Sequence, residues 1–201
     1  DEGLTLPRGC LVRYREWYGI KKDEYGQKLY NVGLKMTAEA VGEGVAVRER
    51  KDGRIQYGVL DPAAFAQDGG PSIEERMRNG SGTALLWRRA DNTRVPLRGA
   101  MGGWDHLRSR LIGEAEDRPM IVCFSSCEDS IRTIPVLQHD KDRIEDIDTE
   151  GEDHAGDEWR YACASRPWVR PSQTEKTIRF PSQRTFNEII AHQVRKRMEA
   201  A

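Results

Sequence analysis

One short segment combines side chains that bind metal ions with the spacing of a single helix face. Within residues 152–162, His154, Asp157, Glu158 and Tyr161 stand at positions i, i+3, i+4 and i+7. Residues at that spacing share one face of an α-helix. A packing helix usually carries Leu or Val there, whereas this one carries an imidazole and carboxylates. Because oxygen ligands, alone or with an imidazole, suit Mg²⁺ or Mn²⁺, the segment predicts part of a divalent-metal site.

Asp61 is the second candidate ligand. The sequence Tyr57-Gly-Val-Leu-Asp-Pro62 indicates a short buried strand that ends in a carboxylate. Pro62 disfavours the α region for the residue before it, which keeps Asp61 extended. Sites in α/β sheets form at the carboxyl ends of strands. A strand-end Asp facing an Asp and a His on a helix is the usual arrangement of a divalent-metal nuclease site.

Each half of this site also has a purely structural explanation. Asp61 before Pro62 is turn chemistry. Asp153 could cap the start of a helix whose acidic face is simply solvated. Glu158 suits a solvated or Arg-paired role better than a metal ligand. The two halves together favour the metal site, because each supplies what the other lacks.

A basic stretch follows another expected strand. Arg88, Arg89 and Arg94 precede a loop that contains glycine and then a helix, which fits either a loop that contacts nucleic-acid phosphates or a solvated loop. A second basic cluster, 195–197, lies near the end of the chain and fits either a solvated helix end or a partner-binding tail.

Composition bounds the remaining possibilities. The chain has 201 residues, with 32 Lys and Arg against 33 Asp and Glu, so net charge gives no argument for nucleic-acid binding. Its four cysteines lack the spacing of a zinc site and predict reduced thiols in an intracellular protein. No apolar run is long enough to cross a bilayer, and the acidic start does not resemble a signal peptide. The lack of an initiator Met suggests a fragment or a processed chain.

The expected elements alternate between strands and helices. Strands are predicted at 10–18, 55–60, 84–88 and 120–124, with a turn and return over 19–33. Helices are predicted at 38–50 behind the N-cap Thr37, after Ser72 in a capping box, near 104–111, near 131–137, and at 153–165. This order predicts an α/β domain, a sheet flanked by helices, over 1–168. Residues 169–201 are expected to form a basic tail with a short helix from about Thr185.

No phosphate-binding P-loop and no Gly-x-Ser-x-Gly nucleophile turn occurs in the chain.

Six motifs in fixed order resemble the C-terminal nuclease domain of the large terminase subunit of tailed bacteriophages and prophages. The similarity covers about residues 6–168 and is carried by the segments 11–19, 57–63, 68–73, 88–92, 103–105 and 153–162. The resemblance implies a ribonuclease H-like mixed sheet flanked by helices. It also implies an endonuclease that cuts concatemeric double-stranded viral DNA during packaging.

In that family, three acidic positions bind two divalent metals, Mg²⁺ or Mn²⁺. The second position matches Asp61 and the third matches Asp157, with Asp153 and His154 completing an Asp-His-x-x-Asp pattern. The metals would activate a water and stabilise the leaving oxygen. The first acidic position belongs to an opening strand just before the segment that resembles residues 1–9. That strand is missing here, so the resemblance implies weak or absent cleavage by this chain and an open sheet edge.

Three functional hypotheses therefore stay open. The first is the terminase nuclease domain, acting on double-stranded DNA in the host bacterial cytoplasm, with the portal protein and small terminase subunit as possible partners and no membrane. The second is a non-catalytic packaging module that keeps the nuclease fold and docks on the portal through its basic tail. The third is a nuclease of the Holliday-junction or transposase type that shares the fold.

Overall fold

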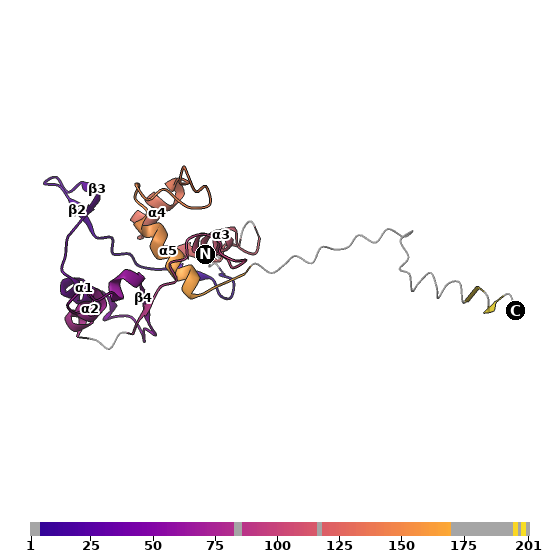
Figure 1. The fold of residues 1–201 in the computed structure, drawn as a ribbon, viewed down its shortest axis with the longest axis horizontal. Helices are drawn as coiled ribbons and strands as arrows, with labels where there is room; N and C mark the ends of the chain where they lie inside the picture. The colour runs from indigo at the N-terminus through magenta and orange to yellow at the C-terminus, as the bar shows by residue number, and fades with distance from the viewer. Residues whose placement is uncertain (1–4, 83–85, 116–117, 170–194, 197, 200–201) are drawn as a thin grey trace. The chain divides into compact units, whose positions relative to one another are not determined.

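The computed structural model describes residues 5–82, 86–115, 118–169, 195–196 and 198–199 (Figure 1). The chain divides into two compact units, 1–170 and 171–201. In the second unit, the N–H of Glu199 donates to the carbonyl of Arg195 at 3.0 Å. The helix expected from about Thr185 otherwise lies outside the described residues. Within the described ranges, no helix is both long enough and apolar enough to span a membrane.

The first unit is a mixed α/β structure, as the sequence predicts. Its α-helices are α1 (Ala38–Glu49), α2 (Ile73–Ser81), α3 (Gly103–Ile112), α4 (Glu128–Thr133) and α5 (His154–Ser165), with 3₁₀ turns η1 (Pro62–Phe65) and η2 (Ile134–Val136). Its strands are β1 (Leu11–Arg13), β2 (Ile20–Lys22), β3 (Lys28–Gly33), β4 (Gly58–Leu60), β5 (Trp87–Arg89) and β6 (Ile121–Cys123).

The strands pair two by two. β1 is parallel to β6, β4 is parallel to β5, and β2 with β3 forms an antiparallel hairpin. In the described ranges these pairs are three separate two-stranded sheets. The α/β class is therefore observed, while a single ribonuclease H-like sheet stays a proposal.

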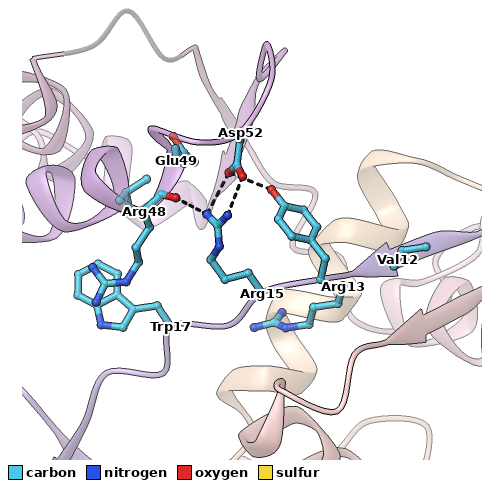
Figure 2. A pocket seen from close by; sticks show the side chains of 9 residues that line it. Val12, Arg13, Arg15, Trp17, Arg48, Glu49 and Asp52 are labelled. Atoms are coloured by element: carbon cyan, nitrogen blue, oxygen red, sulfur yellow. Dashed lines mark hydrogen bonds and ion pairs between the residues drawn. The ribbon is translucent and has the colours of Figure 1, made fainter.

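The strand expected over 10–18 is short because its second half contacts α1 and the turn that follows it instead of another strand. The Tyr14 hydroxyl donates to Asp52 at 3.0 Å, and both Nη atoms of Arg15 donate to the same carboxylate, at 2.6 and 3.0 Å. The guanidinium of Arg48 stacks 3.8 Å from the centre of the Trp17 ring. Figure 2 shows these side chains around a cavity of about 290 Å³. The alternation of the segment predicted a strand over 10–18, and the strand is observed only over Leu11–Arg13.

Helices α1 and α2 pack closely because glycine stands at both points of contact. A Cβ on Gly42 would overlap the main chain of Met77, and a Cβ on Gly80 would overlap the main chain of Glu39. The expected caps are present: the Thr37 side chain accepts from the Ala40 N–H at the start of α1, and a capping box opens α2.

The apolar core joins α3, β6 and α5. Its buried members are Trp104, Leu107, Ile121, Trp159 and Cys163. Because Trp159 and Cys163 face this core, they fix the rotation of α5 about its own axis.

A buried carboxylate joins the segment after β1 to α4. Glu16, whose side chain is 5% exposed, accepts from the main-chain N–H groups of Asp129 and Ser130 and from the Ser130 hydroxyl. It therefore caps the start of α4.

Candidate metal site

Asp61 lies directly after β4, as the sequence predicts, and its carboxylate contacts α5. One carboxylate oxygen accepts from the Ala63 N–H at 2.7 Å, which starts the 3₁₀ turn. The other accepts a short hydrogen bond from the Tyr161 hydroxyl. That bond is the largest of the causes that hold the pKa of Asp61 below its usual value, followed by the Ala63 bond.

Asp157 lies one turn before Tyr161 on α5. Its Oδ1 accepts from Arg160 Nε at 3.0 Å and Nη2 at 2.9 Å, and from Arg94 Nη1 at 3.4 Å. Burial and then the bond to Asp61 raise the pKa of Tyr161 to about 12, and the charge of Asp157 also raises it. The bond from Tyr161 to Asp61 therefore brings the end of β4 against α5, the helix that carries Asp157.

The other two predicted ligands differ in exposure. Asp153 is buried, and burial followed by the charge of Asp157 raises the pKa of its carboxyl group. His154 has a side chain that is 73% exposed, with Nδ1 3.5 Å from an Asp153 oxygen. It lines a cavity of about 350 Å³ between α5 and the β2–β3 hairpin, beside Trp17 and not beside Asp61.

These donors form a partial ligand set. In the ranges that the structure describes, no group of three or more His, Cys, Asp or Glu side chains is placed to hold a metal ion. Mg²⁺, however, is commonly held by one or two carboxylates together with water and substrate phosphate. A site of that kind would need only Asp61 and Asp157 from this chain.

The three predicted DNA-contacting arginines are separated from one another. Neighbouring residues of a strand face opposite sides. Accordingly, Arg88 stacks 4.1 Å from the centre of the Tyr57 ring, while Arg89 stacks 4.8 Å from that of Phe65. Arg94 is an internal residue of the site instead: besides Asp157, it binds an Asp146 oxygen through Nε at 2.7 Å.

Arg160 is a site residue that the sequence analysis missed. It is 1% exposed, and its aliphatic stem lies where a Cβ on Gly103 would be. Its guanidinium carbon is 4.4 Å from the Tyr161 ring centre and 5.4 Å from that of Trp104. The only sequence signal was its i+3 position relative to Asp157, a spacing equally typical of a surface ion pair.

The arrangement is therefore two carboxylates: Asp61 after β4, which is bound to the Tyr161 hydroxyl of α5, and Asp157 on α5, which is paired with Arg94 and Arg160. Such carboxylates can bind a hard divalent cation, or they can stay paired with the positively charged groups that already contact them. Glu158 lies outside the pair and binds Arg13 at 2.6 Å. No protein-family model, curated protein sequence or solved structure matches this chain.

Proposed function

We propose that this chain is the nuclease domain of a viral DNA-packaging terminase, a divalent-metal-dependent endonuclease of double-stranded DNA in the host bacterial cytoplasm. Asp61 and Asp157 are its metal ligands, with Asp153 next to Asp157. The carrying observation is the hydrogen bond from Tyr161 to Asp61, which holds the strand-end carboxylate against the helix that carries Asp157. The ordered motifs of the terminase resemblance support the same assignment.

A bound Mg²⁺ or Mn²⁺ would activate water and stabilise the leaving oxygen of a phosphodiester. The chain's own residues prepare the carboxylates for it. Tyr161 holds Asp61 against α5, while Arg94 and Arg160 hold Asp157 in one orientation and offset its charge. The bonds from Tyr161 and Ala63 hold the pKa of Asp61 below its usual value.

Metal binding tests this proposal. Titration of Mn²⁺ followed by electron paramagnetic resonance should show one weakly bound ion. Asp61→Asn and Asp157→Asn should each weaken it by at least about ten-fold, because each removes a charged ligand. The matched control Asp52→Asn removes a carboxylate that binds Arg15 and Tyr14 far along the chain, and should leave binding unchanged. Equal Mn²⁺ binding by all four proteins would contradict the assignment.

Cleavage gives a second readout. The family that the chain resembles uses three acidic positions, and only Asp61 and Asp157 are assigned here, so slow nicking of plasmid DNA or none is expected in Mn²⁺. Robust nicking that disappears in Asp61→Asn would mean that another residue of this chain supplies the third ligand.

One observation favours the non-catalytic packaging module as the alternative. Both carboxylates already have protein partners, because Asp61 binds Tyr161 and Asp157 binds Arg94 and Arg160. In that case the fold would serve as a docking platform for the portal protein or the small terminase subunit. A folded chain without measurable Mn²⁺ binding that nevertheless binds portal would support this reading.

A further inference from the structure

Two exposed arginines gather on one tyrosine at the other end of β4 from Asp61. Arg88 lies 4.1 Å and Arg166 5.3 Å from the centre of the Tyr57 ring, measured from the guanidinium carbons. Arg166 also donates through Nε to the Tyr57 hydroxyl at 2.8 Å. Tyr57 thus holds two guanidinium groups close together, that of Arg88 from β5 and that of Arg166 from the end of α5.

Neither arginine is neutralised within the described part of the chain. Both are exposed, and no ion pair to a carboxylate involves either one. Arg13, Arg94 and Arg160, in contrast, all bind carboxylates. The hydrogen bond from Arg166, together with the charges of both arginines, lowers the pKa of Tyr57 against the effect of burial. The local potential is therefore positive.

Two members of this cluster, Tyr57 and Arg166, line a cavity that they share with the tyrosine bound to Asp61. The cavity measures about 490 Å³ and is lined by Tyr57 and Arg166, and also by Tyr161, whose hydroxyl binds Asp61. The three residues of β4 lie between Tyr57 and Asp61, so the two are four residue steps apart, or about 13 Å at roughly 3.3 Å per residue. One DNA strand carries a phosphate about every 3.4 Å along the helix axis, so the cluster lies about four nucleotides from Asp61.

We propose that Arg88, Arg166 and Tyr57 form a clamp for a phosphodiester of the DNA backbone, away from the phosphate to be cut. Guanidinium groups match phosphate oxygens in geometry and charge. The choice of DNA rests on the proposed nuclease function. Arg89 and Arg94, which the sequence predicted to contact DNA together with Arg88, are not part of this clamp. Arg89 stacks on Phe65, and Arg94 is bound to Asp146 and Asp157.

The test measures the affinity for a fluorescent DNA duplex by anisotropy, without metal and over a range of salt concentrations. Each phosphate contact contributes about 0.9 to the slope of log affinity against log salt. Because the clamp holds one phosphodiester, Arg88→Gln/Arg166→Gln should reduce the slope by about 0.9. The ratio of variant affinity to wild-type affinity should then be about eight-fold lower at 0.1 M salt than at 1 M salt. Tyr57→Phe, which removes the hydroxyl anchor of Arg166, should give a smaller loss of affinity.

Arg76→Gln/Arg108→Gln is the matched control. It changes the net charge equally, but these arginines are bound to Glu39 and Asp105. It should change affinity by less than about two-fold, and thermal melting checks that both double variants fold. Equal slopes for the two double variants, or no duplex binding by wild type, would overturn the clamp.

Binding of polyglutamate with the same dependence on Arg88 and Arg166 would also overturn it, assigning the cluster to an acidic protein partner. Mn²⁺ binding by Asp61 and Asp157 is measured without DNA, so the nuclease proposal stands or falls separately.

Discussion

Removing one oxygen atom tests the geometry on which the candidate site depends. Tyr161→Phe deletes the hydroxyl that donates to Asp61 and leaves the ring in place. A hydrogen bond to a charged group contributes about 1.5–3 kcal/mol. Asp61 is exposed, so solvent screening should reduce the loss to about 1 kcal/mol. For a domain of this size that corresponds to a fall of about 2–4 °C in melting temperature.

The same change should alter the acid titration of Asp61. Its pKa is below its usual value chiefly because of the Tyr161 bond, so it should rise toward 3.8 in the variant. A lowered carboxyl pKa contributes stability that is present above pH 3.8 and is lost as the pH falls through the folded-state value. Tyr161→Phe should therefore flatten the acid limb of the stability profile.

Carboxyl ¹³C NMR and a double-mutant cycle with Asp61→Asn measure these effects. The cycle should give a coupling energy of at least about 0.5 kcal/mol. Tyr14→Phe is the matched control, because its hydroxyl binds Asp52 instead of Asp61. An unchanged Asp61 titration with zero coupling would show that β4 and α5 do not meet through this bond, and the proposed site would lose its main support.

Three further predictions concern the rest of the chain. Glu16→Gln should cost about 2 kcal/mol in urea unfolding, because buried N–H groups of α4 lose a charged acceptor; a loss below about 0.5 kcal/mol would mean that α4 is capped otherwise. The bond from Arg76 lowers the pKa of Glu39 to about 2. This pair should therefore contribute fully to the free energy of unfolding above pH 4.5, and its contribution should disappear toward pH 2. Glu39→Gln should remove that pH dependence of the unfolding free energy. Truncation after residue 170 should leave the melting temperature of the first unit within about 2 °C while weakening portal binding, and a larger fall would show that the tail is structural.

Local signals in the sequence predicted the local structure well. The N-caps Thr37 and Ser72 and the short strand before Asp61 are where the sequence places them. These features depend on neighbours within about four residues, so side-chain type and spacing determine them. The same holds for the helix that carries Asp157.

Contacts between distant segments were beyond the reach of the pattern. Arg94 was expected at the surface, yet its partners Asp146 and Asp157 lie 52 and 63 residues away. Arg166 carried no motif at all, and its meeting with Tyr57 spans 109 residues. Such pairings depend on how elements pack, which hydrophobic and charge patterns along one segment do not specify.

The crossing of α1 and α2 has a consequence for how the site opens. In sequence, β4 and Asp61 lie between the two helices, so contact at Gly42 and Gly80 closes a loop around the strand-borne ligand. If the helices separate, the ends of that loop are released together. The amide protons of β4 should therefore exchange with solvent at the rate of the helix pair, as one cooperative unit. Weakening the crossing would then increase amide exchange at Gly58, whose N–H donates to the Leu86 carbonyl at 2.9 Å, although Gly58 itself is unchanged.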